Sequence, residues 1–519
     1  MVNEMKKILD SENQYQLTEN GAVGYKTTGK HLVDLNFKVT SMRNGISISD
    51  LDIFVQAMRE DLEYTIKWLF FMRDVRGGMG ERDAFQELYM KYGAYYPNEA
   101  KATLKLVAEF GRWKDVIDII AKDHQNILGG MELVKEAFTN DIKNCAMNKP
   151  ISLLAKWMPS INASAKARQQ AKKIAKYFGI PYSTYRRTLS KLRAYLDVTE
   201  VKTCGNRWGE IDYNKVSSNA NNRYARAFMK HDEKRYVEHC SKAMDVKSNP
   251  DVKMHAEVLY PHEIWKKYSG KIGYYNSYYS ETLTEDVSLE AMWKNLKDLG
   301  DCGNTMVVVD GSGSMTCQIG SIKPIDVSRS LGVYFAERCQ GEFHNILMEF
   351  SSRPQLIDLN DCKSLKDKVV KMLKYDDCTN TNIEAVFMLI LQTAIKSKMK
   401  QSDLPERILI VSDMEFDMAT NNTRCLYGMK ALFDHLAELY AESGYKLPKL
   451  VFWNVCSRTN TIPMTENEMG VIMVSGFSPN ILSMVMSGQT DPWLALKEKL
   501  DSERYACISD TLKSVSDHE

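Results

Sequence analysis

A run of apolar residues that ends in a polar loop constrains the fold of this chain more than any other feature. Residues 306–309 are Met, Val, Val and Val, and Asp310, Ser312 and Ser314 follow them with glycines in between. An unbroken apolar run predicts a strand buried on both faces of a parallel sheet, because a half-exposed strand would alternate with polar residues. Open α/β sheets bind their ligands at the carboxyl ends of such strands. We therefore expect a functional loop directly after this strand.

The rest of the second half repeats this pattern. Mostly apolar segments at residues 346–350, 408–411 and 450–455 predict three more strands, although Glu349 and Asn454 lie within the first and the last of them. Apolar residues at helical spacing, such as Val327 and Leu331, separate them. Alternation of strands with helices predicts βαβ crossovers and a doubly wound, Rossmann-like α/β sheet.

The first half is patterned as helices. Apolar residues recur at helical spacing over residues 51–70, which predicts one helix that begins near Ser49 or Asp50. Residues 163–178 are rich in Ala and Lys, both strong helix formers. Several helices joined by short turns predict an all-α, HEAT-like helical-repeat module, although no clean repeat period is present. A polar stretch at residues 271–286 marks the domain boundary, so we expect domains at residues 1–290 and 296–519.

Composition excludes several classes of protein. A chain of 519 residues exceeds one hydrophobic core, so two or more domains are expected. No stretch approaches the roughly 18 to 20 apolar residues of a membrane span, and we expect no membrane partner. The amino terminus lacks the apolar core of a secretory signal. The 11 cysteines are scattered without a C-x-x-C pair, which predicts reduced thiols and a cytoplasmic location.

Oxygen-bearing residues gather around the predicted strand ends. Asp413 follows the 408–411 run as Asp310 follows the first strand, and Thr379 and Thr381 precede a helical pattern. Carboxylates and hydroxyls are the ligands that Mg²⁺ prefers. Thr381 has the better position, directly before the helix, but Thr379 lies only two residues away and stays open. The sequence therefore predicts a site for Mg²⁺ or another divalent cation.

The order of these residues resembles the metal-ion-dependent adhesion site of von Willebrand factor A (vWA) domains, in which D-x-S-x-S is followed by a threonine and an aspartate. The resemblance implies a vWA domain over residues 296–519 with a metal site built by five residues: Asp310, Ser312, Ser314, Thr381 and Asp413. It also implies that the two serines and the threonine bind the metal directly, and that the aspartates bind directly or through water. No general base is paired with a nucleophile in the sequence, so we expect no enzymatic activity.

Charge is distributed unevenly along the chain. Residues 1–300 contain 46 Lys+Arg and 38 Asp+Glu, whereas the remainder contains 22 and 29. Within the first half, residues 151–235 contain 18 basic and 6 acidic residues. Concentrated positive charge suits the phosphate backbone of a nucleic acid, and a lysine-rich solvated surface is the plainer interpretation.

Several short motifs punctuate the first half. They are FMRDVRGGMGER at 71–82, GRWKD at 111–115, KWMP at 156–159, YRRTLS at 185–190, VSS at 216–218 and LYP at 259–261. These motifs resemble the helical module of the Ro autoantigen (TROVE) family, ring-shaped helical-repeat proteins closed by a vWA domain that bind small non-coding RNAs. They resemble more closely an uncharacterised family of the same two-part build.

Basic side chains in or beside these motifs suit contacts with RNA phosphates. The candidates flank a glycine turn or lie in the basic block: Arg73, Arg76, Arg82, Lys156, Arg186, Arg187, Lys191 and Arg193. The rings of Trp113, Trp157 and Tyr185 suit stacking on unpaired bases, and for the two tryptophans packing in a helical core is the alternative.

We therefore expect a non-catalytic protein that binds small non-coding RNA or single-stranded RNA ends on a basic helical surface, with Mg²⁺ in its vWA domain. The alternative is a cytosolic vWA scaffold that binds no nucleic acid and whose metal accepts a carboxylate from a protein partner. Salt dependence of binding separates the two, because phosphate contacts release counterions.

Overall fold

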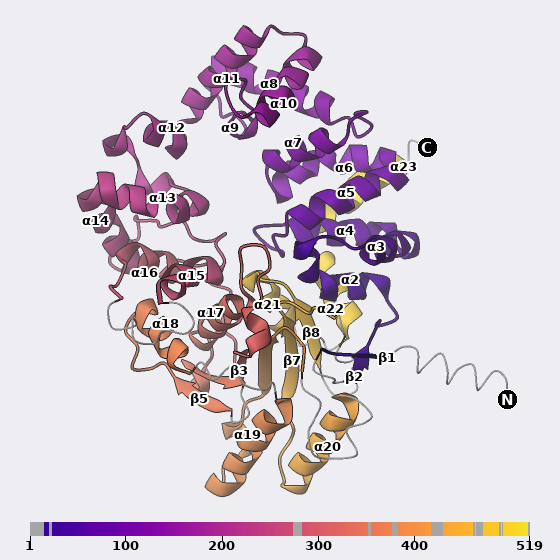
Figure 1. Cartoon of the computed structure of the whole chain (residues 1–519), viewed down its shortest axis with the longest axis vertical. Helices are drawn as coiled ribbons and strands as arrows, with labels where there is room; N and C mark the ends of the chain where they lie inside the picture. The colour runs from indigo at the N-terminus through magenta and orange to yellow at the C-terminus, as the bar shows by residue number, and fades with distance from the viewer. Residues whose placement is uncertain are drawn as a thin grey trace, which may run out of the picture. The chain divides into compact units, whose positions relative to one another are not determined.

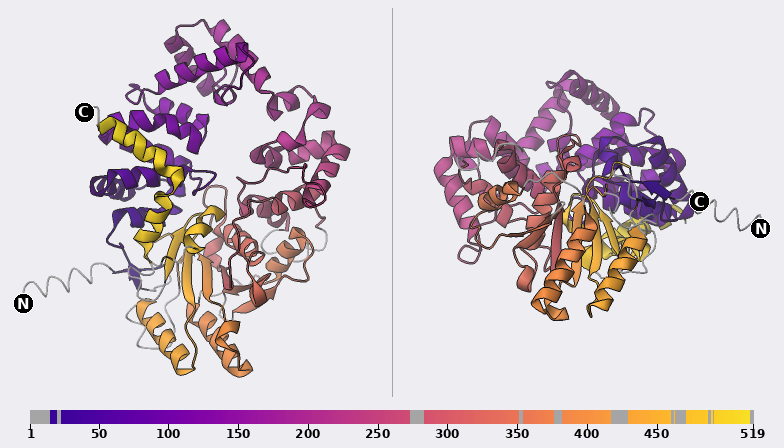
Figure 2. Two further views of the ribbon diagram at one scale, coloured as in Figure 1. Left: turned by 180° about the vertical axis from the view of Figure 1, so that it is seen from behind. Right: turned by 60° about the horizontal axis from the view of Figure 1, so that its bottom comes forward.

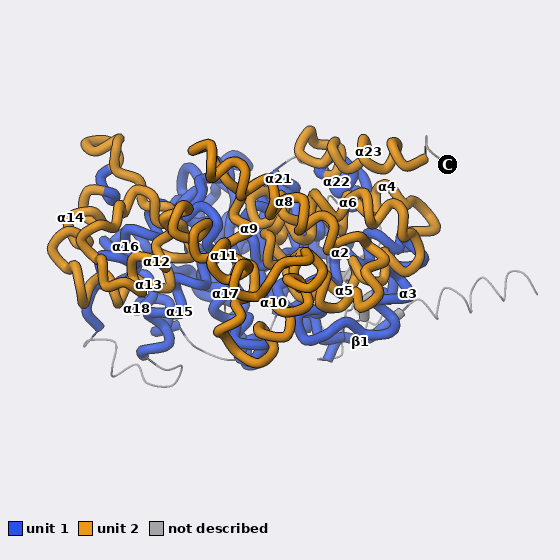
Figure 3. Tube along the Cα trace, turned by 90° about the horizontal axis from the view of Figure 1, so that it is seen from above, with its two compact units in different colours: residues 1–57, 243–245, 256–499 blue, residues 58–242, 246–255, 500–519 orange. Residues whose placement is uncertain are grey.

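The computed structural model describes residues 15–19, 23–272, 283–350, 354–375, 382–416, 429–459, 462, 471–486, 489 and 491–516. The chain forms two compact units, which Figure 3 distinguishes by colour. The α/β unit consists of residues 1–57, 243–245 and 256–499, and the helical unit consists of residues 58–242, 246–255 and 500–519. The expected combination of a helical module with an α/β domain is confirmed.

A six-stranded sheet lies at the centre of the α/β unit (Figures 1 and 2). The strand order is β5-β4-β3-β6-β7-β8, and all neighbours are parallel except β4 and β5. The strands are β3 (Thr305–Asp310), β4 (Ile346–Phe350), β5 (Gln355–Asp358), β6 (Arg407–Ser412), β7 (Lys449–Asn454) and β8 (Ile472–Ser475). Strands β3, β4, β6 and β7 confirm the four predicted strands, whereas β5 and β8 lie outside them.

Helices cover the sheet and extend the α/β unit. They are α2 (His31–Lys38), α15 (Pro261–Ile272), α16 (Val287–Lys294), α17 (Pro324–Ala336), α18 (Leu365–Lys374), α19 (Ile383–Ser397), α20 (Met429–Glu442), α21 (Leu482–Met486) and α22 (Pro492–Leu500). A two-stranded antiparallel sheet, β1 (Tyr15–Leu17) with β2 (Val23–Tyr25), belongs to the same unit.

Strand β3 is buried on both faces, as its apolar sequence predicts. Successive side chains point to opposite faces of a strand. Val309 packs against Gly332 of α17 so closely that a Cβ on the glycine would lie 2.2 Å from the valine Cγ1. Val308, on the other face, joins an apolar core with residues of α19 and α20. Packing on both faces therefore fixes the carboxyl end of β3, where the predicted metal loop begins.

The helical unit is built from consecutive helices. They are α4 (Leu62–Arg73), α5 (Asp83–Tyr95), α6 (Pro97–Phe110), α7 (Trp113–Lys122), α8 (Gly130–Ala146), α9 (Leu154–Trp157), α10 (Ala165–Phe178), α11 (Tyr182–Leu196), α12 (Thr199–Cys204), α13 (Ser218–His231) and α23 (Glu503–Ser516). The division between the units falls within α3 (Ile48–Glu60) and α14 (Glu233–Met244). In the described ranges, no helix combines the length and apolar character needed to span a membrane.

The helical pattern over residues 51–70 forms two helices rather than one. Helix α3 ends at Glu60, and Asp61 then adopts an extended backbone with φ −158° and ψ 101°. The Asp61 carboxylate accepts the N–H of Tyr64 at 3.0 Å and so caps the start of α4. Prediction of a single helix was wrong here because the capping residue interrupts the backbone without interrupting the apolar spacing.

The two units do not follow the boundary that the sequence predicts between residues 290 and 296. Ser269 in α15 donates a hydrogen bond to Asp326 in α17 at 2.8 Å, so this helix packs with the sheet. Arg504 in α23 donates to Asp74 Oδ1 at 2.6 Å, so the C-terminal helix packs with the helical unit. Both arrangements depend on contacts between residues far apart in the sequence, which local patterns do not reveal.

Candidate metal centre and basic surface

The candidate metal centre lies where the order of strands reverses. Strand β3 pairs with β4 on one side and with β6 on the other. The chain leaves β3 through α17 to reach β4, and it adds β6 to the opposite side later. In open α/β sheets, ligands bind at this switch point, outside the carboxyl ends of the strands. Asp310 is the last residue of β3, and Asp413 directly follows β6.

Hydrogen bonds hold the first loop around Asp310. The fully buried Asp310 carboxylate accepts the backbone N–H of Ser312 on Oδ1 at 2.9 Å and the Ser412 hydroxyl on Oδ2 at 2.6 Å. The Ser312 and Ser314 hydroxyl oxygens lie 2.8 Å apart. The D-x-S-x-S loop thus turns one carboxylate and two hydroxyls into a single cluster of oxygens.

Asp413 joins this cluster from the second strand. Burial, together with the negative charge of Asp310, raises the pKa of Asp413 to about 8, and a hydrogen bond with Ser314 acts in the opposite direction. Two buried carboxylates in one cluster repel each other unless a cation compensates their charge. Four of the five predicted ligands therefore come together, and their donor set fits Mg²⁺. Thr381 and its alternative Thr379 lie outside the described residues.

A metal site built by the protein here would use the hydroxyls as well as the carboxylates. No group of three or more His, Cys, Asp and Glu residues within the described ranges is arranged to hold a metal ion. A cation bound by Asp310 and Asp413 would need Ser312 and Ser314 as further ligands. The D-x-S-x-S spacing predicts the same set of ligands, because it places two serine hydroxyls beside Asp310.

Sequence reasoning missed three residues that position the cluster. Ser412 bonds to Asp310, and its place directly before Asp413 was a usable signal. Ser328 in α17 accepts the Asp310 N–H at 3.1 Å and donates to a backbone oxygen of β6 at 2.8 Å, but no motif marks it. Arg458 approaches Asp413 Oδ2 at 3.4 Å and gives that carboxylate a positive neighbour.

The second candidate site is a basic surface in the helical unit. Residues 142–196 contain 12 Lys and Arg and no Asp or Glu. We call this stretch the basic segment; it runs from the end of α8 through α11. Ten of its cationic residues are exposed: Lys143 on α8, Lys149 after it, Lys166, Arg168, Lys172, Lys173 and Lys176 on α10, and Arg186, Arg187 and Lys191 on α11. No ion pair involves any of these ten within the described residues.

Two residues of this region that were predicted to contact phosphates form bonds within the protein instead. Arg193 donates to the backbone oxygens of Ala155 at 2.9 Å and Met158 at 2.7 Å, and to the Ser160 hydroxyl at 2.7 Å. Arg193 thus satisfies groups at the end of α9, and its assignment to RNA is corrected to a structural one. Lys156 forms an ion pair with Glu200 at 2.9 Å and is less available than its neighbours.

The arginines around the glycine turn have different environments. Arg73 is buried and pairs with the fully buried Asp115, so its assignment to RNA is also corrected to a structural one. Arg76 is exposed and donates to a backbone oxygen of α6 at 2.9 Å. Arg82 is half exposed and pairs with Asp83 at 2.8 Å. Only Arg76 and Arg82 keep a surface position in this group.

The tyrosines of the basic segment differ in their exposure to solvent. Tyr185 is fully buried and donates to the Pro159 oxygen at 2.8 Å, so the prediction that it stacks on bases was wrong. Sequence reasoning missed the exposed rings of the basic segment: Tyr177 is 39% exposed, Tyr182 46% and Tyr195 37%. Tyrosines and cations are interspersed in the sequence of this segment. Helical spacing alone, however, does not distinguish a tyrosine that faces solvent from one that is buried.

Two tryptophans were also predicted to stack on bases or to pack in the core. Trp113 and Trp157 are both half-buried. The guanidinium of Arg112 lies 5.0 Å from the ring centre of Trp157, and its Nε lies 3.5 Å from Asp115 Oδ1. These contacts favour the structural interpretation of Trp157.

Comparison with known proteins places the chain in a family. It matches the family described as "Domain of unknown function (DUF2828)" over residues 18–141 and 162–304, just over half of the chain, and it belongs to that family. Residues 304–510 match a second one, "Domain of unknown function (DUF7788)". The chain is also similar to "Uncharacterized protein L728" of Acanthamoeba polyphaga mimivirus, with 28% identity over 504 residues that cover 91% of this chain and 84% of the relative.

Proposed function

We propose that this protein binds RNA through the basic segment and catalyses no reaction. Support comes from 55 consecutive residues without a carboxylate that place ten cations at the surface. Carboxylates would repel phosphates and pair with the cations, but the segment itself contains none. In the part of the chain that the structure describes, only the half-buried Lys156 pairs with a carboxylate from outside the segment, that of Glu200. Exposed tyrosines among the cations add faces on which unpaired bases stack, which favours small or single-stranded RNA.

Salt dependence of RNA binding tests this proposal. Each phosphate contact to a single strand contributes about −0.7 to the slope of log K against log salt. Replacing Arg186, Arg187 and Lys191 with Gln should therefore weaken binding and flatten the slope by about 2. A matched triple variant of exposed lysines in the α/β unit, Lys396, Lys398 and Lys449 to Gln, should leave the slope unchanged. Equal slopes for the two variants would contradict the proposal.

We further propose that the α/β unit is a vWA-like domain that holds Mg²⁺ or another divalent cation. The parallel sheet with one antiparallel edge strand supports this, as does the oxygen cluster at its switch point. Ser312 and Ser314 would bind the cation directly, and Asp310 and Asp413 directly or through water. When bound, the cation would compensate two buried carboxylates and so fix the loops after β3 and β6.

A protein-interaction scaffold is the second candidate function. The observation that favours it is the accessibility of the metal loop, because Gly313 is exposed and Ser314 is only half-buried. A cation held there would have one side open to a carboxylate of a protein partner. Mg²⁺-dependent capture of a glutamate-bearing partner, lost in an Asp310→Asn variant and insensitive to loss of the basic segment, would favour the scaffold over the RNA-binding function.

Both functions suit a cytoplasmic location, which we propose as well. The nine cysteines among the described residues are free thiols, in keeping with a reducing compartment. Oxidised protein from a secretory compartment would instead carry disulfides, which mass spectrometry of protein alkylated in its native compartment would reveal.

A further inference from the structure

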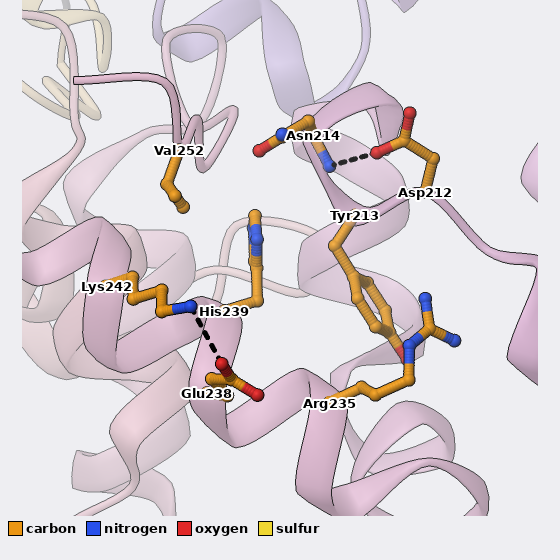
Figure 4. Close-up of a pocket in the computed structure, with 8 residues that line it drawn as sticks. All are labelled: Asp212, Tyr213, Asn214, Arg235, Glu238, His239, Lys242 and Val252. Carbon is orange, nitrogen blue, oxygen red and sulfur yellow. Dashed lines mark hydrogen bonds and ion pairs between the residues drawn. The ribbon is translucent and has the colours of Figure 1, made fainter. Parts of the chain in front are cut away.

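A small pocket in the helical unit is used by neither of the proposed sites. It has a volume of about 250 Å³ and lies between the 3-10 turn η3 (Tyr213–Lys215), helix α14 and the loop at Val252 (Figure 4). Pockets for drug-sized ligands start at roughly 300 Å³. A ligand here is therefore about the size of one planar ring system rather than a peptide or a whole cofactor.

The pocket has aromatic and apolar walls. The rings of Tyr213 and His239 lie 5.5 Å apart between their centres at an interplanar angle of 35°, and Val252 lines the opposite side of the imidazole (Figure 4). The Tyr213 hydroxyl donates to Asp232 at 2.9 Å, which fixes the orientation of its ring. Such walls suit a flat, apolar face of a ligand.

The polar rim is balanced in charge. Two carboxylates, Asp212 and Glu238, face two cations, Arg235 and Lys242. Lys242 pairs with Glu238 at 2.7 Å, and Arg235 donates to two backbone oxygens of the preceding loop at 2.8 and 2.7 Å. Neither cation is therefore free to attract an anion, and a neutral ligand with both donors and acceptors on its edge fits this rim best.

His239 supplies the strongest indication that the pocket receives a ligand. Its Nε2 atom is buried and has no hydrogen-bond partner in the part of the chain that the structure describes. Burial also lowers the pKa of His239, which favours the neutral form of the ring. A buried polar atom without a partner costs free energy, and a ligand edge that bonds to it removes this cost.

We infer that this pocket binds a nucleobase, with its face against Tyr213, His239 and Val252 and its edge bonded to His239 and the polar rim. Nucleobases are flat heteroaromatic rings that carry donors and acceptors on one edge. The base has two sources, a free nucleoside or an unpaired position of bound RNA. The second source rests on the proposed RNA binding, whereas the first does not.

Two substitutions in the full-length chain test the inference. Val252→Trp fills the pocket, and Val246→Trp adds the same ring six residues earlier at a side chain that is 51% exposed, as a control. His239→Phe keeps an aromatic ring but removes the ring nitrogens, so it should fold as well as the parent. Thermal melting of each variant verifies folding. Both pocket substitutions should weaken binding at least about fivefold, and the control should not.

The probes are adenosine, guanosine, cytidine and uridine, titrated by calorimetry, and a short RNA with one 2-aminopurine, followed by fluorescence. Nucleoside binding that Val252→Trp abolishes supports a pocket for free nucleosides. Quenching of 2-aminopurine that depends on Val252 and His239, without nucleoside binding, supports a pocket for an RNA base.

Two other outcomes overturn the inference. One is the absence of nucleoside binding together with 2-aminopurine signals that the pocket variants do not change. The other is equal binding by the parent, both pocket variants and the control. Because the basic segment is tested separately by its salt slope, either outcome leaves the proposed RNA binding untouched, and a failed salt slope leaves free-nucleoside binding untouched.

Discussion

Replacing Asp115 with Asn should strongly destabilise the helical unit. The Asp115 Oδ2 atom accepts hydrogen bonds from Arg73 Nε at 3.0 Å and from Arg73 Nη2 at 2.5 Å. The side chains of Arg73 and Asp115 are 3% and 0% exposed. Asp115 also accepts the backbone N–H of Arg112 at 3.1 Å, which an Asn oxygen can still do. The substitution therefore removes one buried charge and leaves the guanidinium uncompensated.

The expected loss follows from the burial of both partners. Removing one member of a fully buried ion pair costs about 3 to 5 kcal/mol, because the remaining charge has lost its partner and has no water. For a unit of about 200 residues, each kcal/mol lowers the melting temperature by about 2 to 4 °C. We therefore expect the melting transition of the helical unit to fall by about 6 to 20 °C.

Differential scanning calorimetry of the full-length chain measures this shift. The control is Asp83→Asn, since the Arg82–Asp83 pair is 51% and 76% exposed and surface pairs contribute about 0 to 1 kcal/mol. The double variant Arg73→Met/Asp115→Asn should regain much of the lost stability, because it leaves no fully buried charge uncompensated; Arg112, which also loses Asp115 as a neighbour, is 31% exposed. A shift for Asp115→Asn no larger than that for Asp83→Asn would refute the structural role of Arg73.

Three further predictions concern other parts of the chain. Mg²⁺ at 100 times its Kd should stabilise the parent by about 2.7 kcal/mol, and Asp310→Asn should remove this effect in thermal melts. Burial raises the pKa of Asp74, but hydrogen bonds led by that from Arg504 lower it below its ordinary value. Its stabilising effect should thus be present above about pH 4 and be lost below it, so melts of parent and Asp74→Asn should converge there. Gly332→Ala should cost about 1 to 3 kcal/mol in urea unfolding, because its Cβ would overlap a valine of β3, whereas Gly270→Ala meets no atom and should cost nothing.

The sequence predicts the sheet where burial leaves a clear pattern. Strands β3, β4, β6 and β7 are almost entirely buried and are dominated by apolar residues, although Glu349 lies within β4. Edge strand β5 has one buried residue of four, and its short sequence QLID shows no such pattern. Strand β8 has four buried residues, but a segment of four residues is too short to be recognised as a strand from its sequence.

The cluster of the candidate metal loop was predictable because its residues are local in sequence, whereas the roles of the arginines were not. Asp310, Ser312 and Ser314 occupy one loop, and D-x-S-x-S fixes their proximity. Nothing in the local sequence distinguishes Arg73 and Arg193, which bond within the protein, from the exposed Arg186. Their partners lie 42 and 33 to 38 residues away, so only the folded helices decide which arginine is buried. Sequence can therefore identify a basic region without identifying which of its side chains are free to bind.

Photo-crosslinking of the full-length protein to RNA that contains 4-thiouridine tests the central claim most directly. Mass spectrometry of the crosslinked peptides locates the bound RNA on the chain without prior choice of a variant. The account predicts that crosslinks concentrate in residues 142–196, on the surface that carries exposed cations and tyrosines. Crosslinks confined to the α/β unit, or no crosslinks at all at low salt, would contradict it.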